Sequence, residues 1–147
     1  MSGDFDLNRF VRAQDPDYDT ILAELRVGEK KSHWMWYVFP QISGLGGSAN
    51  ARRYAIVSLD EARAYLRHAV LGPRLHECVE RVLAVKGRAV EQIFPYPDDL
   101  KFRSSMTLFE RAAPVPDLFA LAIDKYYGGV RDGATIEILD SLEHRPR

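Results

Sequence analysis

Apolar side chains recur at intervals of three and four residues along most of this chain, and no other feature constrains its fold as strongly. The clearest stripe consists of Tyr18, Ile21, Leu22 and Leu25. Positions three and four apart share one face of an α-helix, whereas a half-buried strand needs a sustained alternation that this sequence lacks. The spacing therefore predicts a mainly α protein, a single compact multi-helix domain with at most a minor edge ribbon.

Capping signals predict several helix boundaries. Asp15 followed by Pro16 is typical of a helix start, with Asp15 as the N-cap. Ser58 and Glu61 have the spacing of a capping box, in which the Ser58 hydroxyl accepts the Glu61 amide proton and the Glu61 carboxylate reaches back to the Ser58 amide. The pair Gly128-Gly129 predicts the end of a helix over 119–127. Residues 134–142 fit either a last short helix or a strand.

Length and composition exclude several classes of protein. A chain of 147 residues fits one domain over residues 1–147. The net charge of −1 gives no basic excess for nucleic-acid binding. No apolar run approaches the length of a membrane span, and residues 1–6 carry no secretory leader. The single cysteine, Cys78, forms no internal disulfide, so we expect a cytoplasmic protein.

The segment 32–57 is the least regular part of the chain and the first place to look for a binding surface. It combines large aromatic rings with a glycine-rich turn at 44–48. Rings can stack on a ligand, while glycines and arginines can surround a phosphate. The candidate ligand-binding residues that follow from this pattern are Trp34, Trp36, Gln41, Gly46, Ser48, Arg52, Tyr54, Lys101 and Ser105.

Two residues are candidates for acid–base chemistry. His33 lies beside two tryptophans, and an imidazole is the kind of group that can transfer protons in an aromatic cleft, although His33 could also be a satisfied neighbour of an aromatic core. Glu61 could act as a general base beside tyrosines, or its carboxylate could be used entirely in the capping box. Lys101 and Ser105 share one side of a helix, where a lysine can activate a serine, but such a stripe can also be plain surface.

The motifs HWMWYVFPQ at 33–41, GLG at 44–46 and SSMTLF at 104–109 resemble the DUF1810 family, a bacterial domain of unknown function. The resemblance spans nearly the whole chain and implies a mainly helical fold without a settled activity. Some members of that family are labelled calpastatin, yet nothing in this sequence supports protease inhibition. A second set, residues 54–66, 86–90 and 105–106, is similar to the NADAR group, which is linked to ADP-ribosylated compounds and N-glycosides. The tryptophan that this group carries after the Gly-Arg step is absent here.

Two hypotheses follow for function. The first is a site for a nucleotide-like, ADP-ribose or N-glycoside compound, which would be an enzyme if the ligand is hydrolysed. In it the segment 34–39, the loop 44–48 and the polar side of residues 101–105 converge on one cleft. The second is a non-catalytic module for protein interaction or self-association, so a homo-oligomer stays open. No cofactor or metal is expected, because the four histidines lack metal-ligand spacing.

Overall fold

The computed structural model describes residues 5–115 and 117–143 and confirms the mainly α fold. In chain order the elements are α1 (Asn8–Gln14), the 3-10 turn η2 (Asp15–Asp17), α2 (Tyr18–Val27), α3 (Met35–Val38), α4 (Ala49–Arg53), α5 (Leu59–Arg67), α6 (Leu71–Ala84), α7 (Val90–Ile93), α8 (Asp98–Ala112), α9 (Asp117–Tyr127) and α10 (Gly133–Glu143). Within the described residues, strand-type pairing is limited to one isolated parallel bridge between Ile42 and Ile56. The predicted helix or strand at 134–142 is therefore a helix.

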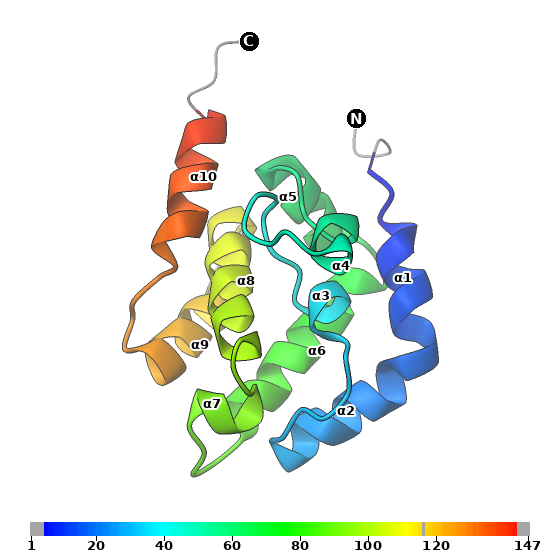
Figure 1. Ribbon diagram of the computed structural model, residues 1–147, viewed down its shortest axis with the longest axis vertical. Helices are drawn as coiled ribbons and strands as arrows, with labels where there is room; N and C mark the ends of the chain where they lie inside the picture. Colours follow the sequence, from blue (N-terminus) through cyan, green and yellow to red (C-terminus); the bar gives the residue numbers. More distant parts are fainter. Residues whose placement is uncertain (1–4, 116, 144–147) are drawn as a thin grey trace.

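The central element is α8, which packs against α9 on one side and α5 on the other, while α6 closes the core behind them. Figure 1 shows α8 between the α9–α10 arm and the short helices α3 and α4. Its predicted core residues Phe102, Met106 and Phe109 are fully buried. Its remaining face is also largely buried, because Ser104, Ser105, Thr107 and Leu108 are covered by neighbouring helices. The expectation of a polar side open to water or to a polar cleft was wrong at these positions.

The prediction that Asp15 is the N-cap of a helix was also wrong. Asp15 has helical backbone angles, φ −52° and ψ −48°, whereas an N-cap needs an extended conformation. The chain passes from α1 through η2 into α2 without leaving the helical region, and Pro16 is accommodated in that tight turn. The Asp15 carboxylate instead pairs with Arg74 of α6 at 2.9 Å.

Other predicted boundaries are confirmed. Ser58 is the N-cap of α5, and its Oγ accepts the Glu61 amide proton at 3.2 Å. The Glu61 carboxylate bonds to the amide of Val57 rather than to that of Ser58. Gly128 and Gly129 follow the last residue of α9 with φ values of 60° and 82°, which favour glycine.

Across residues 5–115 and 117–143, no helix is long and apolar enough to cross a membrane. The longest, α8, has 15 residues, and a span needs about 20.

Candidate functional site

Glu61 lies in a closed polar junction between α1, the chain before α5, and α5 itself. Its side chain is 3% exposed and pairs through Oε2 with Arg9 Nη2 at 3.1 Å. Its Oε1 accepts the amide proton of Val57 at 2.8 Å. Arg9 also donates to the carbonyl oxygens of Arg53 and Ala55, both at 2.9 Å. Both Glu61 oxygens are engaged and the carboxylate faces no solvent, so the structure gives it a cross-linking position and no access for a substrate.

Trp34 anchors the loop after α2. It is 1% exposed, and its Nε1 donates to Glu24 Oε1 at 2.9 Å. Burial would raise the pKa of Glu24, but hydrogen bonds from the Ser32 side chain, the amides of Lys31 and Ser32, and Trp34 lower it to about 2. A ring so deeply buried has no face for a ligand, which corrects the stacking role expected for Trp34. His33, beside it, is exposed.

Trp36 and Lys101 are the predicted residues that the structure brings together. Lys101 Nζ lies 5.2 Å from the centre of the half-buried Trp36 ring. Its ammonium also contacts Asp98 Oδ1 at 3.3 Å, and Asp98 Oδ2 binds Lys30 Nζ at 2.7 Å. One carboxylate thus holds two lysines, so Lys101 ties α3 to the start of α8. The ion pair of Lys30 with Asp98 could not be predicted from the sequence, because it forms only when the loop after α2 folds back onto the start of α8.

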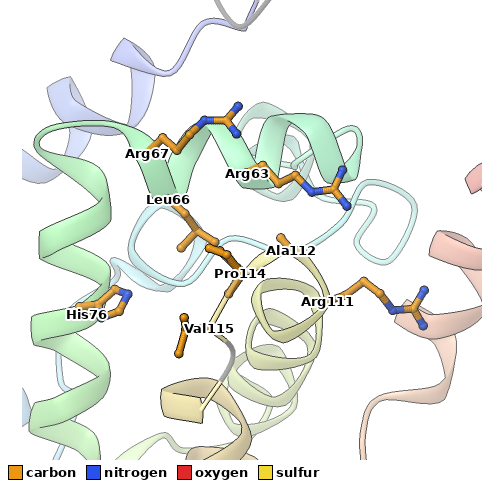
Figure 2. A pocket seen from close by; sticks show the side chains of 9 residues that line it. Arg63, Leu66, Arg67, His76, Arg111, Ala112, Pro114 and Val115 are labelled. Atoms are coloured by element: carbon orange, nitrogen blue, oxygen red, sulfur yellow. The ribbon is translucent and has the colours of Figure 1, made fainter.

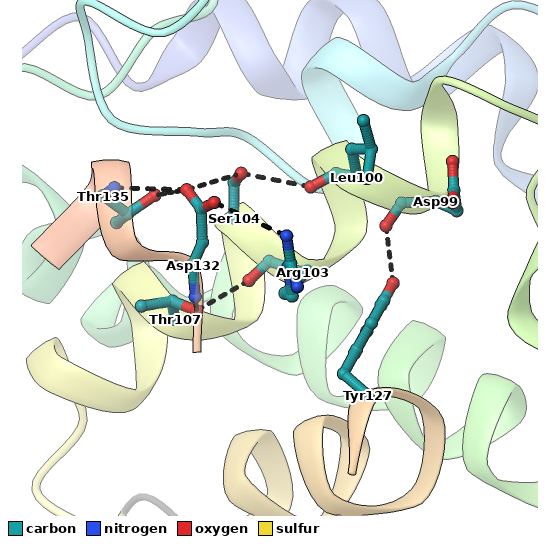
Figure 3. Close-up of polar contacts among 8 residues, drawn as sticks. All are labelled: Asp99, Leu100, Arg103, Ser104, Thr107, Tyr127, Asp132 and Thr135. Atoms are coloured by element: carbon teal, nitrogen blue, oxygen red, sulfur yellow. Dashed lines mark hydrogen bonds and ion pairs between the residues drawn. The ribbon is translucent and has the colours of Figure 1, made fainter. Parts of the chain in front are cut away.

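The hydroxyl side of α8 holds the start of α10. Ser104 Oγ lies 3.1 Å from Asp132 Oδ2, and Thr107 Oγ1 accepts the Asp132 amide proton at 3.0 Å. The same Asp132 oxygen accepts the amide proton of Thr135 at 3.1 Å, which caps α10 (Figure 3). Ser105 is fully buried and its Oγ has no hydrogen-bond partner within the described residues. Ser105 therefore has no opening to a ligand.

The predicted ligand-binding residues between positions 41 and 54 lie in and around α4, away from Lys101. Ser48 caps α4 by accepting the Ala51 amide proton at 3.1 Å, and Arg52 is exposed on that helix. Tyr54 packs its ring 5.4 Å from that of Tyr37. Gln41 is half-buried, and its carbonyl oxygen accepts the Ile56 amide proton at 2.8 Å.

The glycine loop does not reach Lys101. A Cβ at Gly44 would lie 3.4 Å from Ile138 of α10, and one at Gly46 would lie 2.6 Å from Cβ of Ala51. Figure 1 shows this loop beside α4 and α5, near the end of α8, whereas Lys101 lies near its start. The loop at 44–48 therefore lies apart from Lys101, although segment 34–39 meets the start of α8 where Trp36 contacts Lys101. The single cleft expected from the three segments is not formed. The binding roles of Trp36, Gln41, Gly46, Ser48, Arg52, Tyr54 and Lys101 stay predictions.

A basic groove that the sequence did not indicate lies between α5, α6 and the chain after α8. Its volume is about 510 Å³. It is lined by Arg63, Leu66, Arg67, His76, Arg111, Ala112, Ala113, Pro114 and Val115 (Figure 2). The apolar members form its floor, and the charged members come from two helices that approach one another only in the folded chain.

The three arginines of this groove are paired to different extents, and Arg111 contacts Asp140 and Glu143 of α10. Within the described residues, Arg67 has no ion-pair partner, and none of the lining residues is acidic. Arg63 contacts only Asp60 of its own helix at 3.3 Å, and both side chains are well exposed. Exposed pairs of this kind stabilise little and are easily exchanged for another anion. The spacing of Arg63 and Arg67, one helical turn apart, is the sequence signal that could have pointed to this rim.

The groove presents side chains of the kind that bind anions. Guanidinium groups bind phosphate or carboxylate through paired hydrogen bonds. His76, whose ring lies 5.8 Å from that of Phe119, adds an imidazole to the lining. The lining residues include no carboxylate, hydroxyl or thiol. Within the described residues, no group of three or more His, Cys, Asp or Glu side chains is placed to hold a metal ion.

The comparisons with known proteins agree with the fold. A family model described as "Protein of unknown function (DUF1810)" matches residues 4–139. The crystal structure of the conserved hypothetical protein Rv1873 from Mycobacterium tuberculosis is 56% identical to this chain and has a TM-score of 0.92. That match covers 92% of this chain and 97% of the other. No curated protein matches, and the expected similarity to the NADAR group is not shown.

Proposed function

The chain belongs to the DUF1810 family, whose description assigns no activity, and we propose from its geometry that it binds a small nucleotide-like anion in the groove between α5 and α6. The observation that carries this proposal is that three arginines, a histidine and several apolar side chains line one groove without any acidic lining residue. The whole chain has a net charge of −1, so a general positive charge of the surface does not account for this lining.

The class of ligand follows from the two kinds of surface in the groove. Leu66, Pro114 and Val115 offer an apolar area for a flat ring, and Arg63 and Arg67 offer paired donors to phosphate. A nucleotide, ADP-ribose or a related phosphorylated N-glycoside combines both parts. The proposal is binding alone, because the groove carries no carboxylate to act as a base in hydrolysis.

An interaction module is the competing function. The large apolar side chains that are exposed include Val27, Val70, Leu121 and Val130, which come from separate segments. Among residues 5–115 and 117–143, these side chains therefore form no apolar stripe along one helix of the kind that marks a protein interface. An acidic peptide in the groove is the version of this function that the arginines would support.

Thermal denaturation with and without added ligand tests the proposal. ADP-ribose, AMP, adenosine and inorganic phosphate would be compared at equal concentration. A ligand at about a hundredfold its Kd should stabilise the fold by roughly 2.7 kcal/mol. We expect ADP-ribose and AMP to stabilise more than adenosine or phosphate alone, because each of the latter carries one half of the recognised chemistry.

Matched variants locate the site. Arg67→Gln should weaken binding about tenfold, since hydrogen bonds to charged groups contribute roughly 1.5 kcal/mol or more. Arg52→Gln removes the same charge from exposed α4, outside the groove, and should leave the affinity unchanged. Equal weakening in both variants, or no stabilisation by any of the four compounds, would show that the groove is not a nucleotide site. Stabilisation by a poly-glutamate peptide alone would favour the interaction module.

A further inference from the structure

Arg111 connects the groove to α10. Its side chain lines the groove, yet its Nη1 contacts Asp140 Oδ1 at 3.2 Å and Glu143 Oε1 at 3.3 Å, both on α10. Figure 2 shows the Arg111 side chain extending away from His76 toward α10. The strongest donor at this end of the groove is thus turned toward two carboxylates of the same chain.

The two ends of α10 are held very differently. Its start is fixed by Asp132, which bonds to Ser104 and Thr107 of α8 and caps the helix at Thr135, and by Arg131 Nη2, which binds Glu110 Oε2 at 2.6 Å. Its second half is flanked by two open grooves of about 400 and 380 Å³, which separate it from the chain before α5 and from the start of α5. Between these grooves Leu139 packs into the core, so the part of this half that meets solvent is its acidic end at Asp140 and Glu143.

The carboxylates that hold Arg111 are themselves half in solvent. The Asp140 and Glu143 side chains are 52% and 46% exposed. Arg63 lines the basic groove and also the groove that contains Glu143, so the same acidic helix end faces a second rim arginine. Ion pairs at this exposure are weak enough for a phosphate to replace.

We propose, on the premise that the groove binds a nucleotide-like anion, that the acidic end of α10 is a built-in competitor for Arg111 and lowers the affinity of the groove. A bound phosphate would take Arg111 from Asp140 and Glu143, and the acidic end of α10 would lose these two ion pairs to α8. Because the coupling is thermodynamic, a ligand that weakens this tie is bound more tightly when the tie is already absent. The acidic end therefore sets the ligand concentration at which the groove fills.

Calorimetric titration of ADP-ribose into the full chain and its variants tests this regulation. The double variant Asp140→Asn/Glu143→Gln should bind about three- to tenfold more tightly than the wild type, the range expected for releasing two exposed ion pairs. Glu137→Gln is the matched control: it removes one negative charge from the same helix at a residue that makes no ion pair with Arg111. Its affinity should stay within twofold of the wild type.

The same double change in an Arg111→Gln background separates a direct effect from a general change in charge. If the carboxylates act by holding Arg111, they should no longer alter the affinity in that background. The proposed competition for Arg111 would be overturned if the gain in affinity persists in the Arg111→Gln background. An equal gain in Glu137→Gln would also overturn it. If the wild type binds ADP-ribose and the double variant binds it with the same affinity, the competition is overturned, but the proposed ligand site is still supported. Absence of any wild-type binding would overturn the ligand site, and the competitor with it.

Discussion

Gly72 lies in the first turn of α6 beneath the carbonyl group of Leu66, where the chain turns from α5 into α6. A Cβ at position 72 would lie 2.2 Å from that carbonyl oxygen. The obstacle is backbone, which cannot rotate aside as a side chain can. We expect Gly72→Ala to lower the free energy of unfolding by about 2 kcal/mol or more, because overpacking forces the backbone to shift. Urea unfolding followed by circular dichroism measures the loss.

Gly133→Ala is the control for this substitution. Gly133 begins α10, and a Cβ there would meet no atom within 4 Å. Alanine should leave stability unchanged or raise it by up to about 1 kcal/mol, because alanine favours a helix more than glycine does. Equal losses in both variants would mean that the close approach at Leu66 is not what requires Gly72.

The residue scale also shows where sequence reasoning stopped. The aromatic segment and the capping serine could be recognised from local pattern, and Trp36 does lie beside Lys101. The use of Glu61 could not be recognised, because its partner Arg9 comes from the first helix. Trp34 was expected at a ligand, but its indole is held by Glu24 from α2. Such pairings depend on the tertiary fold, and neither partner's residue type reveals them.

At the scale of elements, the cap of α5 is an accessible test. Ser58 Oγ satisfies the Glu61 amide, so Ser58→Ala should cost about 1 kcal/mol of stability. Ser48→Ala removes the corresponding cap from α4, a five-residue helix without buried residues, and should cost less. The two urea midpoints decide the matter: an unchanged midpoint in Ser58→Ala would show that the cap does not contribute.

The loop after α2 should respond to acid through Glu24. Its pKa is lowered from 4.5 to about 2, against the effect of burial, by hydrogen bonds to Ser32, Lys31 and Trp34. Because the pKa of Glu24 is lower in the folded than in the unfolded chain, its carboxylate stabilises the fold at any pH above the unfolded pKa of 4.5. This stabilisation is lost as the pH falls from about 4.5 toward 2. Glu24→Gln lacks this contribution at every pH. The difference in stability between wild type and variant should thus be largest at pH 6 and shrink toward pH 2.

Urea unfolding at pH 6, 4 and 3 follows that difference. Other carboxylates titrate in the same range, but they do so in both proteins and largely cancel. A difference that stays constant down to pH 3 and below would show that the Glu24 carboxylate is not stabilised by the loop.

Periodicity predicted the helices well but did not predict the burial of α8. A helix with apolar residues on one face is expected to expose the other. In α8 the second face carries Ser104, Ser105 and Thr107, which are small enough to pack between helices. Thr107 Oγ1 also donates to the carbonyl oxygen of Arg103, so its polarity is satisfied inside the helix. Small hydroxyl residues on a helix therefore do not indicate that its face is exposed, and the face of α8 that was expected to be polar and open is buried.

For the whole molecule, Cys78 is a natural reporter of unfolding. It is the only cysteine in the chain and is 1% exposed in α6. Burial raises the pKa of its thiol to about 12, which keeps the reactive thiolate scarce. We expect labelling by a thiol reagent at pH 8 to be negligible in the native state and to rise together with the loss of helical signal in urea. Rapid labelling without urea would mean that α6 opens independently of the rest of the core.

The groove belongs to this largest scale, which explains why the sequence did not predict it. Arg63 and Arg67 could be read as a solvated helix face, and His76 as a surface residue of another helix. Only the packing of α5 on α6, with Pro114 and Val115 laid across them, makes a single concave surface. Sequence reasoning predicted the class of ligand from a different segment, and that class remains a proposal at the new location.

The central position of α8 has a consequence for dividing the gene. The exposed turn at 86–89 is the natural place for a cut, but the cut would leave α8 and α9 in one fragment and the helices they pack against, α5 and α6, in the other. Each fragment would then present a large apolar surface that only the other can cover. The two pieces, made separately, should stay unstructured and regain helical structure when mixed. The domain could thus be converted into a two-part complementation reporter, in which assembly signals that two fused proteins have met.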